Sequence, residues 1–65
     1  MRLKFIGKDN SMGLIHGEVY GVEVVSEHGY IWVIIPKFKF SRTMIATWEC
    51  PYSSPQTFAE NWSLP

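Results

Sequence analysis

Apolar and polar residues alternate in short runs along most of the chain, which is the pattern of half-buried β-strands. The strongest run, residues 30–35, is a continuous series of aromatic and β-branched residues. Turn-forming residues separate the runs. The pattern predicts strands over residues 2–6, 18–25, 30–35, 37–40 and 43–48.

One of these runs changes its phase partway along. Under strict alternation, Val19 and Val25 fall out of step with Val22 and Val24. Gly21 lies between the two sets, and a bulge or sharp bend at a strand glycine would reconcile them. The sequence therefore predicts a bend at Gly21.

Turns and breaks are predicted at three further places. Residues 26–29 (Ser-Glu-His-Gly) predict a hairpin turn with Gly29 at positive φ, so the flanking strands pair antiparallel. Pro36 lacks a backbone N–H and therefore ends or bends the strand over 30–35. Residues 7–13 are dense in turn formers and predict a loop.

The last part of the chain has the features of a short helix. Ser54 is suited to cap a helix, and Pro55 is suited to its first position. Phe58 and Trp62 are four residues apart and would share the helical face that packs on the sheet. Residues 63–65 are expected to fray.

These elements predict a mainly β fold. The expectation is one domain over residues 1–65, built as a small SH3-like barrel or a strongly bent antiparallel sheet of four or five strands, with one short C-terminal helix. A chain of 65 residues has room for one domain. Ten aromatic residues supply enough apolar surface for a core without covalent cross-links.

The cysteine content and the charge narrow the class of protein. Cys50 stands alone, which excludes an intramolecular disulfide and agrees with a reducing cytoplasm. The net charge is zero, which argues against a general polyanion binder. The charge is nevertheless uneven: residues 9–36 carry four acids and no Lys or Arg, and residues 37–42 carry three cations and no acid.

No group of residues predicts catalysis or metal binding. His16 and His28 are each next to glycine in expected turns, without a spacing that builds a zinc site. Glu49 precedes Cys50, and an adjacent carboxylate disfavours the thiolate that a nucleophile needs. Residues 9–11 (Asp-Asn-Ser) lack the spacing of a calcium loop. We therefore expect no enzyme, no cofactor and no metal site.

The best candidates for a binding surface are the cations of residues 37–42 and the tryptophans. Cations in residues 37–42 are suited to contact an acidic partner, and exposed tryptophans are suited to anchor it. The alternative is that the aromatic residues form the core and the lysines protect an edge strand from aggregation. The predicted binding residues are Trp32, Lys37, Lys39, Arg42 and Trp48.

Five segments of the chain form a recognisable set: residues 7–14 (Gly-Lys-Asp-Asn-Ser-Met-Gly-Leu), 16–20 (His-Gly-Glu-Val-Tyr), 29–33 (Gly-Tyr-Ile-Trp-Val), 50–55 (Cys-Pro-Tyr-Ser-Ser-Pro) and 58–62 (Phe-Ala-Glu-Asn-Trp). Together these segments resemble a group of short phage and prophage proteins. The resemblance implies a small SH3-like barrel with a short terminal helix. It also implies an accessory protein that binds a host protein, nucleic acid or a small signalling molecule.

The leading expectation is a non-enzymatic binding module that acts in the cytoplasm of a bacterial host cell on a host or phage protein. One alternative is single-stranded nucleic-acid binding through the same cations and aromatic residues. Another is an oligomeric sponge that sequesters a nucleotide-like signalling molecule. No membrane association is expected because the longest apolar run is far below a membrane span, and a homo-oligomer remains open.

Overall fold

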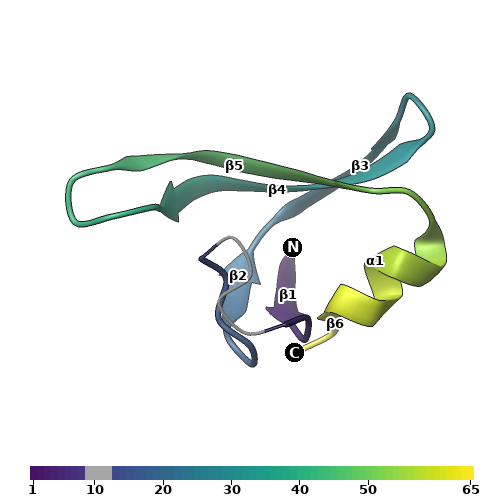
Figure 1. Ribbon diagram of the computed structural model, residues 1–65, viewed down its shortest axis with the longest axis horizontal. Helices are drawn as coiled ribbons and strands as arrows, with labels where there is room; N and C mark the ends of the chain where they lie inside the picture. Colours follow the sequence, from purple (N-terminus) through teal and green to yellow (C-terminus); the bar gives the residue numbers. More distant parts are fainter. Residues whose placement is uncertain (9–12) are drawn as a thin grey trace.

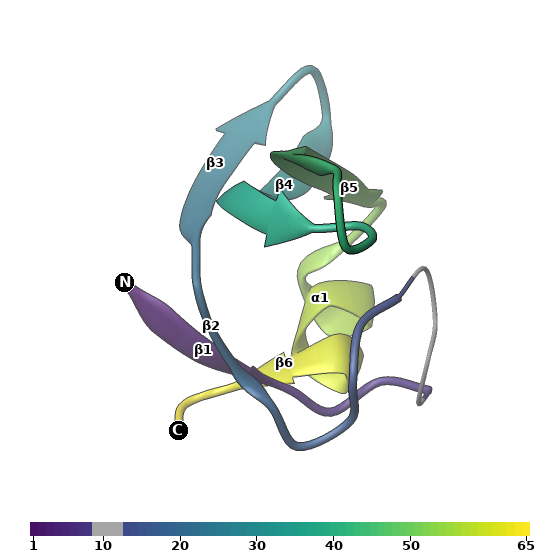
Figure 2. The same cartoon turned by 90° about the vertical axis from the view of Figure 1, so that its left-hand side faces the viewer.

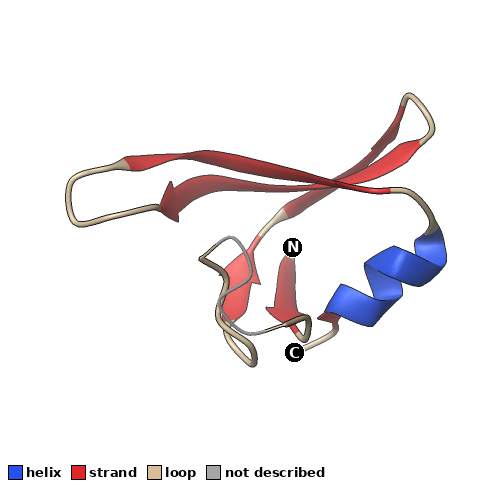
Figure 3. Cartoon of the chain, viewed as in Figure 1, coloured by secondary structure: helices blue, strands red, loops and turns tan. Residues whose placement is uncertain are grey.

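The alternating runs form strands, and the fold is mainly β. The structure is a computed structural model that describes residues 1–8 and 13–65. Over these residues the chain forms six strands and one helix (Figures 1 and 3). They are β1 (Arg2–Phe5), β2 (Val19–Gly21), β3 (Glu23–Glu27), β4 (Tyr30–Lys39), β5 (Ile45–Tyr52), α1 (Pro55–Asn61) and β6 (Trp62–Ser63).

The strands form two antiparallel sheets. The first has the order β2-β1-β6 and the second the order β3-β4-β5. Figure 2 shows the second sheet above the first, with α1 at one side of the space between them. The mainly β prediction with antiparallel pairing and a short helix near the C-terminus is confirmed. The sheets do not close into a barrel, and the described residues form six strands where four or five were predicted.

The predicted bend is present where the chain passes from one sheet to the other. β2 ends at Gly21, and β3 begins at Glu23 in the second sheet. Val22 lies between them, is buried, and exchanges hydrogen bonds with Met1: its N–H donates to the Met1 carbonyl oxygen at 2.8 Å, and the Met1 amine donates back at 3.1 Å. The change of phase in the valine pattern thus marks a change of sheet.

The hairpin between β3 and β4 has the predicted turn. Glu27 pairs with Tyr30, which leaves two residues in the loop. Both have positive φ, at 53° for His28 and 79° for Gly29. This is the type I′ geometry, whose twist matches that of the flanking strands.

Pro36 bends its strand but does not end it. β4 continues to Lys39, so the separate strand predicted over 37–40 is part of β4. The pairing with β5 shifts register between Ile35 and Phe38, which is a β-bulge. β5 starts two residues later than predicted and runs to Tyr52; it accepts Pro51 because it is an edge strand.

The helix begins as predicted and ends one residue earlier than expected. The Ser54 hydroxyl accepts the Thr57 N–H at 3.1 Å, and Pro55 occupies the first turn. Trp62 is extended and belongs to β6, so Phe58 and Trp62 do not share a helical face. Nor does Ser63 fray, because it pairs with Lys4.

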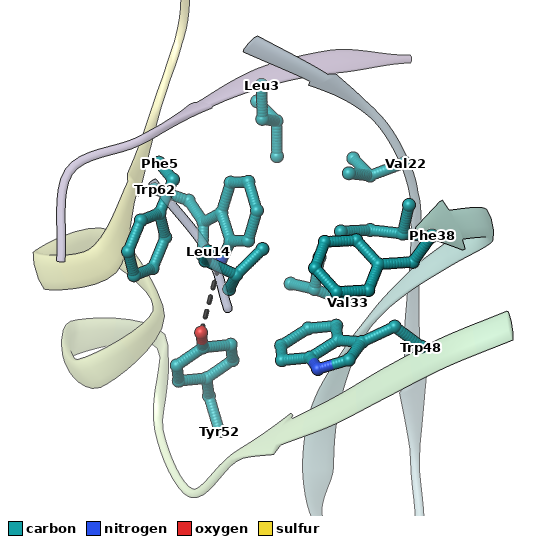
Figure 4. Close-up of a cluster of buried hydrophobic side chains, with 10 residues drawn as sticks. Leu3, Phe5, Leu14, Val22, Val33, Phe38, Trp48, Tyr52 and Trp62 are labelled. Carbon is teal, nitrogen blue, oxygen red and sulfur yellow. Dashed lines mark hydrogen bonds between the residues drawn. The ribbon is translucent and has the colours of Figure 1, made fainter. Parts of the chain in front are cut away.

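An aromatic core fills the space between the two sheets (Figure 4). The Phe5 and Trp62 rings meet edge to face at 5.2 Å. The Trp62 indole N–H donates to the Tyr52 hydroxyl at 2.9 Å, which satisfies a buried polar group and ties β6 to β5. The core residues are Leu3, Phe5, Leu14, Val22, Val33, Ile35, Phe38, Trp48, Tyr52 and Trp62.

Replacing Tyr52 with Phe removes the acceptor for the Trp62 indole and leaves a buried N–H unpaired. We expect the free energy of unfolding to fall by about 1–3 kcal/mol, as measured by urea denaturation. Tyr30→Phe is the matched control because Tyr30 is 47% exposed. We expect that control to change stability by less than about 0.5 kcal/mol, and equal losses in the two variants would contradict the role of this bond.

Candidate functional site

Trp48 belongs to the core and not to a binding surface. Its side chain is 3% exposed and packs on the Phe38 ring, with the ring centroids 6.0 Å apart. Inward orientation follows from the register, because Trp48 lies opposite the buried Ile35. The prediction that Trp48 serves as an exposed aromatic anchor is therefore corrected.

The three predicted cations lie on a projecting hairpin, which we call the arm (residues 36–47). The ends of β4 and β5 form it, and Figure 1 shows it extending beyond the rest of the fold. Lys37, Lys39 and Arg42 are all exposed on it, and its sequence contains no acidic residue. It also exposes three large apolar side chains, those of Phe40, Met44 and Ile45.

A groove of about 850 Å³ separates the base of the arm from the first sheet. β3 pairs only with Tyr30–Ile34 of β4. Residues 35–39 pair with β5 on one edge, but their other edge, on the β3 side, has no strand partner among the described residues. β2 is the outer strand of its own sheet. The groove therefore runs between two unpaired strand edges. Its main lining side chains are Ile15, Tyr20, Val22, Ile35, Lys37, Phe38 and Lys39.

The two walls of the groove carry opposite charges. Lys37 and Lys39 line the β4 wall, Glu18 lies just before β2 on the other wall, and Glu23 lies at the start of β3. Tyr20 forms part of the floor, and its hydroxyl accepts the Ile15 N–H at 3.0 Å. The groove thus offers apolar contact, two kinds of charge and free backbone groups.

Trp32 lies on another surface, the outer face of the second sheet, which we define by the outward residues of β3, β4 and β5. Val25, Trp32 and Pro51 are directly opposite one another in the register, so their side chains share this face. The Trp32 indole N–H donates to the Glu27 carbonyl oxygen at 3.3 Å, and the Tyr30 ring lies 6.2 Å away. A hollow of about 260 Å³ lies beside Trp32.

The outer face around Trp32 is acidic. Glu23 and Glu49 are both opposite Ile34, and Glu27 is opposite Tyr30. Lys37 follows Trp32 by five residues on the same strand, a separation of about 16 Å at 3.3 Å per residue. The structure therefore places Lys37 and Lys39 beside the groove, whereas Trp32 lies farther along β4 and does not line it.

Burial raises the pKa of two titratable side chains near the helix, those of Cys50 and Tyr52. Burial raises the pKa of the Cys50 thiol, which keeps it protonated at neutral pH. Burial likewise raises the pKa of Tyr52 to about 12. His28 lies 3.4 Å from the exposed Glu27 carboxylate, and His16 Nδ1 lies 2.9 Å from the Gly7 carbonyl oxygen. Within residues 1–8 and 13–65, no cluster of His, Cys, Asp and Glu could hold a metal ion.

The candidate calcium loop, residues 9–11, lies outside the described residues. No described helix has the length and hydropathy that a membrane crossing requires.

Sequence reasoning missed the groove because it depends on pairing between distant strands. A signal was available in the lengths of the runs: the chain changes phase at Gly21, and only six residues separate Gly21 from the turn at His28. A strand of five residues cannot cover a partner of ten. An unpaired edge on β4 follows from that mismatch.

No family model, no curated protein and no solved structure matches this chain. The fold and the surfaces define it as a small, mainly β protein with two three-stranded antiparallel sheets over the described residues. The resemblance to short phage and prophage proteins stays a prediction.

Trp48→Ala and Trp32→Ala should differ sharply in stability. Truncating a buried Trp costs about 3–5 kcal/mol, which is most of the stability expected for a domain of this size. We expect Trp48→Ala to lose cooperative thermal unfolding in circular dichroism and Trp32→Ala to keep it. An unfolded Trp32→Ala variant beside a stable Trp48→Ala variant would contradict this placement.

Proposed function

We propose that this protein is a non-enzymatic binding module that takes up an extended segment of a partner protein in the groove. The observation that carries the proposal is the pair of strand edges, on β2 and on residues 35–39 of β4, for which the described residues supply no strand partner. An extended peptide can add to such an edge as a further strand, so that main-chain hydrogen bonds supply affinity and side-chain contacts supply specificity.

The charge of the arm supports an acidic segment as the ligand. Lys37 and Lys39 flank the free edge, and Arg42 extends the positive charge toward the tip. Because the arm sequence has no acidic residue, its cations are not neutralised by neighbours along the arm. They would attract an approaching acidic segment and select its register in the groove.

Two further points bear on the biological setting of this proposal. The chain passes from the first sheet to the second at Val22, and this division of one run between two sheets supports an open SH3-like arrangement. The resemblance to phage and prophage proteins supports a host or phage protein as the partner, in the cytoplasm of a bacterial cell.

The two alternative functions have less support. Single-stranded nucleic-acid binding needs stacking aromatic residues beside the cations. Phe40 is exposed there, but Trp48 is buried and Trp32 lies among glutamates. A sponge for a nucleotide-like molecule needs a pocket between subunits, and the groove lies within one chain.

The proposal can be tested with peptides selected from a random display library on the immobilised protein. We expect the selected peptides to be β-prone and to contain Asp or Glu. Titration of one such synthetic peptide, followed by amide NMR, should shift residues 35–39 and Val19–Gly21. Selection without enrichment, or shifts confined to the outer face, would contradict the proposal.

Charge reversal supplies the matched comparison. We expect Lys37→Glu to weaken binding of the selected peptide by about tenfold, which is about 1.4 kcal/mol. Lys8→Glu makes the same charge change at an exposed site that does not line the groove, and affinity should change less than twofold. Equal effects of the two substitutions would show that only net charge matters.

A further inference from the structure

The outer face of the second sheet has nothing packed against it in the described chain. Figures 1 and 2 show β1, β6 and α1 on the opposite side of this sheet. All five residues of β3 are exposed, and Val25 and Tyr30 are 38% and 47% exposed. Exposed apolar side chains on an uncovered face mark an interaction surface.

This face continues along the arm without interruption. Alternation on β5 puts Ile45, Thr47, Glu49 and Pro51 on one side, because successive side chains of a strand point to opposite faces. Lys39 is directly opposite Ile45, so it shares that side. The bulge between Ile35 and Phe38 preserves the continuity by adding one residue to β4.

Charge along the face changes sign from one end to the other. The half of the face on the side of the β3–β4 turn carries Glu23, Glu27 and Glu49, and no described Lys or Arg lies on this half. The arm end carries Lys39, and Arg42 lies in the turn beyond. On β5, Thr47 lies midway between Ile45 and Glu49, two residues from each.

A surface with this order of charges is complementary to itself. If a second copy is turned by a two-fold axis that lies across the strands at Thr47, strand directions reverse and each strand faces its own counterpart. The register then places Lys39 of one copy over Ile34 of the other copy, between the Glu23 and Glu49 side chains of that other copy. By the same step, the turn that carries Arg42 lies over Trp32, which suits a cation–π contact.

We infer that the outer face is the interface of a symmetric homodimer. The occupant is a second copy of this chain, because the cationic segment that the acidic half requires is this chain's own arm. Each contact between Lys39 and the glutamates occurs twice, as in an isologous interface. Stacked sheets lie about 10 Å apart, a spacing that Lys and Glu side chains can bridge. Lys39 and Glu23 also line the groove, whereas Glu49 and Trp32 lie on the outer face and do not line it.

Reciprocal charge reversal tests this interface. In analytical ultracentrifugation we expect the wild-type mass to rise with concentration from 7.5 kDa toward twice that value, less so at high salt. The Lys39→Glu variant and the Glu23→Lys/Glu49→Lys variant should each stay monomeric, because like charges then oppose each other. An equimolar mixture of the two should dimerise again, since each variant supplies the charge that the other has lost.

Controls separate this result from an effect of net charge or folding. Lys8→Glu and Glu60→Lys change exposed residues away from the outer face and should dimerise like the wild type. Circular dichroism confirms that each variant is folded. A wild-type chain that is monomeric at every concentration would overturn the proposal. So would variants that each dimerise normally, or a mixture that stays monomeric.

A cross-link locates the two-fold axis independently. In a Cys50→Ser background, Thr47→Cys places a thiol opposite its own counterpart across sheets about 10 Å apart, and a short bismaleimide cross-linker should convert most of the chain to a covalent dimer. Glu60→Cys, exposed on α1, should cross-link several-fold less under the same conditions. Equal yields from the two positions would overturn the proposed axis.

Discussion

The structure depends on the way one run of residues is divided between two sheets at Val22. That residue completes the ladder between β1 and β2 through its hydrogen bonds with Met1, and the next residue already pairs with β4. The division places two apolar faces opposite each other and so creates the core. It also shortens β3 to five residues against the ten of β4. The unpaired edge, the groove and the projecting arm all follow from that mismatch.

A second constraint is the small size of the chain. A domain this short buries a limited share of its surface, so each large side chain in the core carries much of the stability. Trp62 combines two contributions: its ring packs on Phe5, and its indole N–H is satisfied by Tyr52. This pair joins β6 to β5 across α1, and within residues 1–8 and 13–65 no backbone ladder connects the two sheets. Aromatic packing thus replaces the closure that a barrel would obtain from hydrogen bonds.

Local features of the fold could be predicted from the sequence, whereas long-range features could not. The bend at Gly21, the turn at His28-Gly29 and the Ser54 cap depend on the conformations of a few neighbouring residues. By contrast, the spacing of Phe58 and Trp62 predicts one shared helical face. Trp62 instead pairs as a strand residue with Phe5, which lies far away in the chain. The outward orientation of Trp32 and the burial of Trp48 likewise depend on which side of the bulged ribbon each residue occupies.

The candidate surfaces also follow from how many aromatic residues the core can hold. Of ten aromatic side chains, five are buried, while Tyr20 and Phe58 pack partly against them. The remaining three, Tyr30, Trp32 and Phe40, lie toward opposite ends of β4, where the adjacent charges are acidic at one end and basic at the other. A net charge of zero therefore describes two oppositely charged regions and not a neutral surface. Because each region combines charge with exposed aromatic area, each can recognise the opposite charge, including that of an identical chain.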